Sequence, residues 1–280
     1  MSYVRIATAN LLHGRSLADG VVDPVRMTAA ITDLGADVVA LQEVDRNQSR
    51  SGNFDQTAAI AMAFAATPEN PVSYRFVPTI IGEPGGRWIA AGPTDPHSGD
   101  DLASTEGLPA AYGIGLVTRF PVEAWHVVRL PAAPVKSPIM MPGTRRLVLL
   151  PDEPRVAVVA VLRAGVAPFR TVATTHLSFV PGWNIRQLRT LLGAIDALPG
   201  PRVILGDLNL PARAVQAVLS ARRSSRWSSV TGVATYPGPE PRIQFDHVLS
   251  DVPLVVTAPA RAVAMAISDH RALVVDVAAP

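Results

Sequence analysis

The sequence contains no cysteine, so disulfides, thiolate nucleophiles and cysteine-ligated zinc sites are excluded. Charged residues make up only 17% of the chain, whereas hydrophobic residues make up 48%. This balance is typical of a well-filled globular core and excludes extended disorder, which needs low hydrophobicity and high charge. Lys136 is the only lysine, so arginine supplies nearly all of the positive charge.

Long apolar runs and a strong net charge are also lacking. The longest apolar stretches, such as Val156–Leu162, are much shorter than a membrane span. The first residues reach the polar Asn10 and His13 too soon to contain the apolar region of a signal peptide. We therefore expect a cytoplasmic protein without stable membrane insertion. The formal net charge of +2 predicts no strong electrostatic field around it.

Short runs of Val, Ile and Leu alternate with helical segments along the chain, which is typical of an α/β domain. No linker or internal repeat is visible, so we predict a single domain over residues 1–280. The predicted strands are Val4–Thr8, Val38–Gln42, Arg75–Pro78, Gly115–Thr118, Ala124–Arg129, Arg146–Leu150, Val156–Leu162, Arg170–Thr175, Val203–Leu205, Asp246–Leu249 and Leu273–Asp276. The predicted helices are Pro24–Leu34 with Asp23 as its N-cap, Gln56–Ala66 with Asp55 as its N-cap, Trp183–Leu198 and Pro211–Ala221. Residues 80–111 are rich in Gly, Pro, Asp and Ser and predict a long loop without secondary structure of its own.

Polar residues stand where many of the predicted strands begin or end. They are Asn10, Glu43, His176, Asp207, Asn209, Asp246, Asp269 and His270. Side chains at the strand ends of a rigid sheet can converge on one pocket, so we expect these residues to lie together. Taken singly, each has a structural explanation: Asn and Asp form turns, a strand-end glutamate is commonly solvated, and a lone histidine commonly packs in the core.

Taken together, these residue types suit the hydrolysis of a phosphate ester. The negative charge of the ester repels an incoming hydroxide, and a hard cation held by carboxylate and amide oxygens would neutralise that charge. A histidine paired with a carboxylate can act near neutral pH as a base or as a cationic phosphate ligand. The ordered set therefore indicates a metal-dependent phosphoesterase that uses Mg²⁺ or Mn²⁺.

The series of motifs from Ala7-Thr8-Ala9-Asn10 to Ser268-Asp269-His270-Arg271 resembles the endonuclease/exonuclease/phosphatase superfamily. That superfamily includes DNase I-like nucleases, abasic-site nucleases, inositol-phosphate phosphatases and sphingomyelinases. The resemblance implies a four-layer α/β/β/α sandwich, in which two packed mixed β-sheets are flanked by helices and the active site lies at one sheet edge. It also implies that Glu43 is the principal metal ligand, helped by Asn10 and Asp269.

The same resemblance implies the catalytic roles. Asp207 and Asn209 would position or deprotonate the nucleophilic water and hold the phosphate. His270 would bind phosphate and act as general base or acid, oriented by Asp246, and His176 would be a second phosphate-binding histidine. Which of Asp207 and His270 takes the proton from water is left open.

Tyr112 resembles a family tyrosine that can contact the phosphate, but Ile114-Gly115 stand where the family often has Asn-Ala. Leu12 occupies the position of a second metal-proximal acid, which disfavours a two-metal site. His13 could be functional or structural. We expect a small molecule or a lipid headgroup as the substrate, since the net charge is close to zero.

Three alternatives stay open at this point. A nuclease would need a groove of arginines, for which the cluster Arg222, Arg223 and Arg226 is a candidate, although a solvated helix end explains it equally. A catalytically silent binding module on the same fold would be expected to have lost one of these residues. Residues 80–111 and 136–144 could form a lid over a small substrate. The sequence indicates no oligomeric state.

Overall fold

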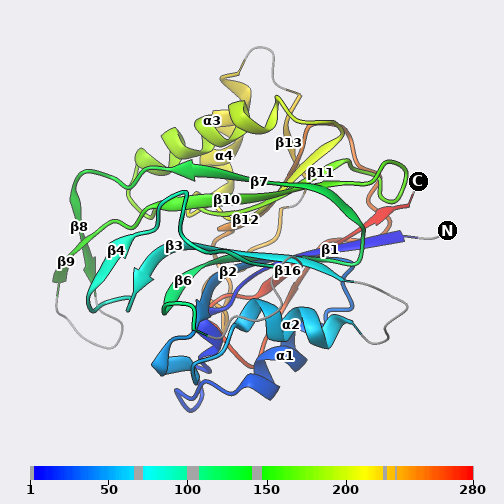
Figure 1. The fold of residues 1–280 in the computed structure, drawn as a ribbon. Coiled ribbons are helices and arrows are strands. Elements are labelled where there is room, and N and C mark those ends of the chain that lie inside the picture. Colours follow the sequence, from blue (N-terminus) through cyan, green and yellow to red (C-terminus); the bar gives the residue numbers. More distant parts are fainter. Residues whose placement is uncertain are drawn as a thin grey trace.

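Two β-sheets stacked face to face form the centre of the molecule (Figure 1). The computed structural model describes residues 3–65, 72–99, 107–140, 147–222, 226–230 and 232–279. The first sheet has the strand order β15-β16-β1-β2-β6-β3-β4, with β5 paired to β3. Its strands are β1 (Tyr3–Asn10), β2 (Val38–Arg46), β3 (Ser73–Gly82), β4 (Trp88–Ala90), β5 (Ser98–Gly99), β6 (Ala111–Thr118), β15 (Arg261–Val263) and β16 (Ala272–Ala278).

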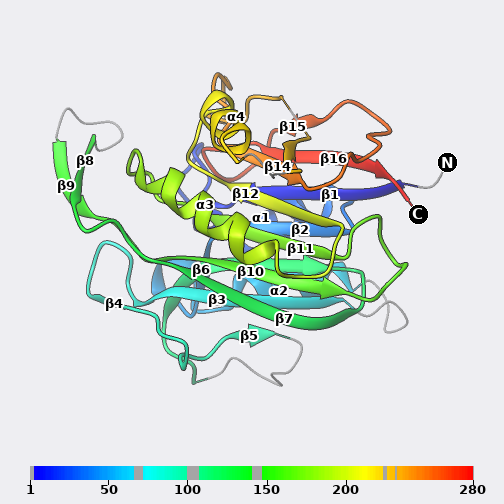
Figure 2. The same ribbon diagram turned by 90° about the horizontal axis from the view of Figure 1, so that it is seen from above.

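The second sheet has the order β13-β14-β12-β11-β10-β7. Its strands are β7 (Val122–Leu130), β10 (Arg155–Leu162), β11 (Thr171–His176), β12 (Arg202–Asp207), β13 (Ser228–Ser229) and β14 (Asp246–Ser250). A separate hairpin of β8 (Lys136–Met140) and β9 (Leu147–Pro151) projects beyond the sandwich at the left of Figures 1 and 2. Both sheets contain parallel and antiparallel pairs, as a mixed sheet does.

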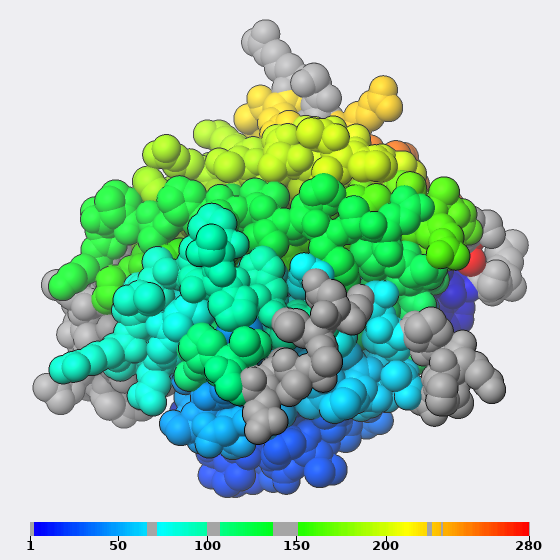
Figure 3. All heavy atoms as spheres, viewed as in Figure 1, coloured from blue at the N-terminus to red at the C-terminus, as the bar shows by residue number. Residues whose placement is uncertain are grey.

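Helices cover the outer face of each sheet. The helices α1 (Pro24–Thr32) and α2 (Gln56–Phe64) pack on the first sheet, and α3 (Trp183–Ile195) and α4 (Ala212–Ser220) pack on the second. Figure 2 shows α3 and α4 lying over the second sheet, and the layers form successive bands in the space-filling view of Figure 3. The predicted α/β/β/α sandwich of two mixed sheets is therefore confirmed. None of the helices in the described part of the chain is long and apolar enough to cross a membrane.

The sandwich forms because its strands are apolar on both faces. In β10, Val156, Val158 and Ala160 pack between the sheets, while Ala157 and Val159 pack beneath the helices. Side chains alternate between the two faces of a strand, so a continuous apolar run such as this fills two cores at once. Burying one such valine contributes roughly 1.5–3 kcal/mol.

The structure corrects one expectation about the loops. Within residues 80–111, β3 continues to Gly82, and the short strands β4 and β5 follow, so the described part of this segment is not a loop without secondary structure. The pattern of alternating residues cannot reveal strands of two or three residues at a sheet edge, because long-range pairing alone defines them. Residues 100–106 of that segment and residues 141–144 of the second proposed lid lie outside the described residues.

Candidate active site

The ends of five strands bring polar side chains to one edge of the sandwich. In the second sheet His176 ends β11, Asp207 ends β12 and Asp246 begins β14, and the three are direct register partners across neighbouring strands. In the first sheet Asn10 ends β1, and His270 lies just before β16. The two sheets thus place these candidate side chains in one region, as their positions at the ends of predicted strands indicated.

These side chains surround a cavity of about 390 Å³. Seven of the nine predicted residues line it: Glu43, Tyr112, His176, Asp207, Asn209, Asp269 and His270. Asn10 and Asp246 lie directly behind that lining and hydrogen-bond to it. The candidate site is therefore one connected group.

Asn10 connects two of the acids. Its Nδ2 donates to Glu43 Oε1 at 2.9 Å and to Asp207 Oδ2 at 3.1 Å, while its Oδ1 accepts the backbone N–H of Leu12 at 3.1 Å. Glu43 has a φ of +55° at an irregularity in the pairing of β2 with β6, a left-handed conformation that is rare for a residue other than glycine. The irregularity turns the Glu43 carboxylate toward the cavity. Burial raises the pKa of Glu43 and the charge of Asp269 raises it further, although the Asn10 hydrogen bond opposes both.

His270 forms a buried pair with Asp246. Its Nδ1 lies 2.8 Å from Asp246 Oδ2, which also accepts a hydrogen bond from Thr235 Oγ1 at 2.6 Å. Burial lowers the pKa of His270, but the charges of Asp246 and Asp207 outweigh burial and raise that pKa to about 10. The imidazole is therefore a cation near neutral pH, with Nε2 directed to Asp207 Oδ2 at 3.7 Å.

Asp207 is the centre of the hydrogen-bond network. Its Oδ1 accepts the backbone N–H of Asn209 at 2.9 Å, and its Oδ2 lies 3.6 Å from His176 Nε2. Burial raises the pKa of Asp207; His270 opposes this rise and Asp246 adds to it. Burial, together with the charge of Arg155, lowers the pKa of His176 well below its ordinary value, so His176 is a neutral ring. The Asn209 amide lies 3.1 Å from His176 Nε2 and fixes the ring.

The donor set fits a hard divalent cation. Glu43 and Asp269 bring two carboxylates together at the cavity, and their mutual repulsion is the kind that a bound cation relieves. A second group, formed by Asp207, Asp246 and His270, has ligand atoms within 4.8 Å of one another. His270 is already paired with Asp246 in that group, so the Glu43 side offers the freer oxygen ligands.

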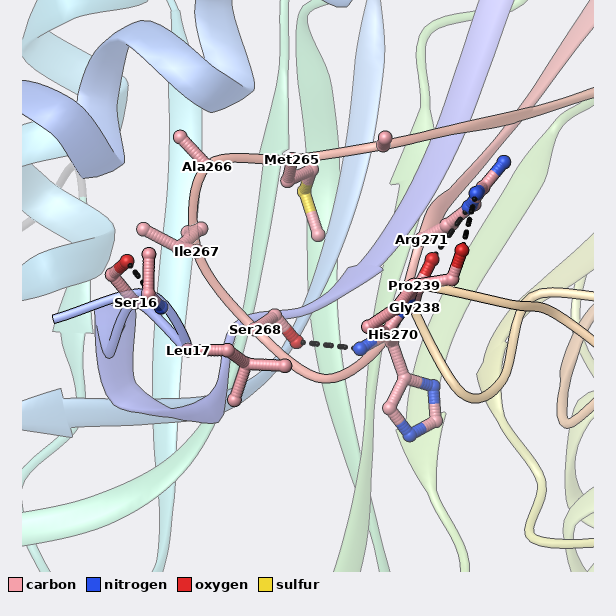
Figure 4. Close-up of a pocket in the computed structure, with 12 residues that line it drawn as sticks. Ser16, Leu17, Gly238, Pro239, Met265, Ala266, Ile267, Ser268, His270 and Arg271 are labelled. Atoms are coloured by element: carbon pink, nitrogen blue, oxygen red, sulfur yellow. Dashed lines mark hydrogen bonds between the residues drawn. The ribbon is translucent and has the colours of Figure 1, made fainter. Parts of the chain in front are cut away.

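A second cavity of about 360 Å³ borders the turn that carries His270 (Figure 4). Ser268 Oγ accepts the backbone N–H of His270 at 3.1 Å and donates to the backbone oxygen of Asn10 at 2.7 Å. Arg271 Nε donates to Gly238 O at 2.7 Å, which ties the same turn to the segment that follows Tyr236. These contacts fix the backbone from which the His270 ring reaches the first cavity.

Five further residues line the first cavity and were not predicted: Glu153, Arg155, Phe179, Tyr236 and Phe245. The centroid of the Tyr236 ring lies 4.8 Å from that of the His270 ring and 5.4 Å from that of the Phe245 ring, so these three rings pack together. None of the sequence motifs contains these five residues. Only Phe245 could have been predicted, from its position next to Asp246.

His13 does not line this cavity. It lies in a short 3₁₀ segment with a φ of +48°, and its backbone oxygen accepts Gln56 Nε2 at 2.7 Å. The geometry favours the structural interpretation of this histidine. Arg222, from the candidate basic cluster, pairs with Asp196 at 2.5 Å.

Comparison with known proteins agrees with this geometry. The model of the Endonuclease/Exonuclease/phosphatase family matches residues 7–270. Solved structures with the same fold include an endonuclease/exonuclease/phosphatase from Beutenbergia cavernae, with 23% identity, a TM-score of 0.63 and coverage of 99% of this chain and 72% of that one. An endonuclease/exonuclease/phosphatase from Bacteroides vulgatus has 16% identity and a TM-score of 0.63, with 100% of both chains covered. A mannosyl-6-phosphatase from Bacteroides thetaiotaomicron has 13% identity and a TM-score of 0.57, with 98% of this chain and 99% of that one covered.

At these identities the solved structures establish the fold alone. No curated protein matches the sequence significantly.

Proposed function

Because the chain belongs to the endonuclease/exonuclease/phosphatase family, we propose that it is a Mg²⁺- or Mn²⁺-dependent phosphoesterase that hydrolyses its substrate by water attack. The observation that carries the proposal is the row His176, Asp207 and Asp246 on three neighbouring strands, with His270 and Glu43 around the same cavity. Turn formation explains each residue alone, but it does not explain their convergence from two sheets.

Glu43 and Asp269 are the proposed metal ligands, with Asn10 beside them. Asn10 directs its amide NH₂ toward Glu43, so its side chain would have to turn before its oxygen could ligate an ion. A bound divalent cation would neutralise phosphate charge and stabilise the leaving oxygen.

The remaining residues have separate roles in the hydrolysis. Asp207 has a raised pKa, so it is the better proton acceptor for the attacking water, and Asn209 holds it in place. His270 is charged and buried, which makes it a ligand for a phosphate oxygen and a proton donor to the leaving group. His176 and Tyr112 contribute neutral contacts to the phosphate.

The substrate that we propose is a small molecule or a lipid headgroup. The cavity of about 390 Å³ accommodates a compact ester, and the net charge of +2 provides no broad basic surface for a polyanion. The pairing of Arg222 with Asp196 also removes one arginine from the cluster that a nuclease would need. A nuclease is the second candidate.

The direct test is hydrolysis of bis(p-nitrophenyl) phosphate with Mg²⁺ or Mn²⁺ and with a chelator. We expect turnover that the chelator and His270→Ala each abolish, while His126→Ala, a change at an exposed histidine of β7, keeps wild-type activity. Turnover that survives either treatment would contradict the proposal. Metal binding without turnover on any ester would favour the silent binding module.

Nicking of supercoiled plasmid distinguishes the second candidate. A nuclease should nick plasmid at least as efficiently as it cleaves the small ester, and its binding should weaken steeply between 50 and 200 mM salt, as counterion release requires. We expect neither result.

A further inference from the structure

Arg155 is a buried arginine without a hydrogen-bond acceptor. It begins β10, is 5% exposed and lines the first cavity together with His176 and Tyr112. Among the hydrogen bonds of the described residues none comes from its guanidinium, and its Nε is buried without a partner. A buried guanidinium without a hydrogen-bond acceptor is costly, so one at the wall of a cavity requires an explanation.

Asp152 does not satisfy this arginine. Asp152 Oδ2 accepts the backbone N–H of Ala133 at 2.7 Å and Ser178 Oγ at 2.8 Å, which holds the carboxylate away from the guanidinium. Arg155 Nη2 and Asp152 Oδ1 form an ion pair at 3.6 Å, a distance longer than a hydrogen bond. Glu153 lines the same cavity and makes no ion pair with Arg155 among the described residues.

The other arginines of the fold show what a satisfied guanidinium looks like here. Arg50 makes two contacts of 2.8 Å with Asp45, and Arg5 contacts Asp276 at 2.6 and 3.0 Å. Arg46, which is fully buried, also has an unpartnered Nε, but its Nη1 donates to the backbone oxygen of Pro96 at 2.8 Å. Arg155 has the same donors and faces the cavity instead of an acceptor.

We propose that Arg155 binds a non-bridging oxygen of a dianionic phosphate, and that the site therefore prefers phosphomonoesters to phosphodiesters. This inference rests on the proposed hydrolysis and names its substrate class. A monoester phosphate has three non-bridging oxygens and two negative charges, which suits a guanidinium in addition to His270 and the cation site. A diester carries an alkoxy group on the third oxygen.

Arg155 makes that alkoxy group unfavourable. With a diester in the cavity, the guanidinium would face a neutral alkoxy oxygen in place of an anionic one and would lose access to water. A site built to hydrogen-bond one group discriminates strongly against an analogue that lacks it, because the buried donors are left unpaired. The preference for a monoester therefore depends on the charge and the hydrogen-bond donors of one side chain, and the width of the cavity does not decide it.

Two substrates with the same leaving group test the preference. p-Nitrophenyl phosphate and methyl p-nitrophenyl phosphate differ only by one methyl on the third oxygen, so changes in the ratio of their kcat/KM values between variants report on that oxygen. We expect Arg155→Met to lower the monoester-to-diester ratio by at least ~30-fold, with the diester value within about 3-fold of wild type. Arg186→Met, which removes an exposed arginine of α3, should leave the ratio unchanged. Equal losses on both substrates, or an unchanged ratio in Arg155→Met, would overturn the proposal.

Binding without turnover provides an independent measurement. By calorimetry, we expect the wild type to bind inorganic phosphate at least ~10-fold more tightly than dimethyl phosphate, and Arg155→Met to bind the two alike. If Arg155→Met is unfolded, Arg155→Lys replaces it: we expect lysine, without the planar fork, to lose most of the phosphate preference. A wild type that hydrolyses neither ester would refute the proposed function, whereas equal binding of the two phosphates would refute the role of Arg155.

Discussion

Asp246→Asn tests the electrostatics of the candidate site most directly. The substitution keeps the shape of the side chain and removes the charge that faces His270 Nδ1 at 2.8 Å. The rise of the His270 pKa from 6.5 to about 10 corresponds to roughly 5 kcal/mol. Asp246, Asp207 and Asp269 together produce this rise against the cost of burial, and Asp246 contributes most. We therefore expect the pKa of His270 in the variant to fall below about 8.

The assay is an NMR titration of the histidine rings in metal-free protein with a chelator present. The wild-type His270 should titrate near 10, far from the ordinary histidine range. Asp251→Asn is the matched control, since it removes an acid that pairs with Arg202 and leaves His270 unchanged. A variant in which His270 still titrates above about 9 would show that Asp246 does not cause the shift.

The same pair makes a pH-dependent contribution to stability. The pKa of His270 is higher in the folded state than in the unfolded state, so its contribution is complete below pH 6.5 and is lost as pH rises through about 10. The free energy of unfolding of the wild type should therefore exceed that of Asp246→Asn by a few kcal/mol at pH 6.5, and the difference should shrink toward pH 10.5. Urea unfolding in chelator measures it, and a difference that grows with pH would refute the reasoning.

Three further predictions concern the metal ligands, a buried histidine and the core. Glu43→Gln should weaken Mn²⁺ binding at least ~10-fold by calorimetry, whereas the exposed Glu123→Gln should not; equal affinities would place the ion elsewhere. Burial holds the pKa of His13 at about 4, so the free energy of unfolding of the wild type should fall by on the order of 1–2 kcal/mol relative to that of His13→Asn between pH 6.5 and pH 4. Parallel pH profiles of the two proteins in urea unfolding would contradict this. Leu191→Ala, in the core beneath α3, should cost about 2–5 kcal/mol of unfolding free energy, and a loss below about 1 kcal/mol would mean that α3 is loosely packed.

Local signals in the sequence located the helix starts correctly. Asp23 accepts the backbone N–H groups of Val25 and Arg26, and Asp55 accepts that of Ala58, as expected of N-caps. These interactions join residues two or three positions apart, so the sequence itself contains both partners. The first two helices were predicted for this reason, whereas the helix from Trp183 was predicted from the spacing of its apolar residues and the last helix from Pro211. The predicted helix ends differ from the structure by a few residues.

The strand-end residues could be predicted because their motifs are short and fall at fixed points of the fold. Arg155 could not be predicted, because its significance depends on the hydrogen bonds that Ala133 and Ser178 donate to Asp152. Ser178 and Asp152 are 26 residues apart in the sequence. The contact of the Tyr236 ring with His270 depends in the same way on packing between segments that are far apart in the sequence. Sequence patterns indicate which residues are near a strand end, but a missing hydrogen-bond acceptor appears only once every neighbour is in place.

The site also depends on how the two sheets are aligned, because its residues come from both. Gln42 in β2 is fully buried; it accepts a hydrogen bond from Thr8 in β1 at 3.2 Å and donates to Thr174 in β11 at 3.1 Å. Asn10 and His176 follow those two threonines by two residues, so each lies on the same strand face as its threonine, one step nearer the cavity. Apolar packing between sheets tolerates small sliding, whereas a buried hydrogen bond is lost when its partners separate. The bridge through Gln42 therefore fixes the relative position of the sheets directly beneath the site, where a shift of one ångström would separate Asn10 from Asp207.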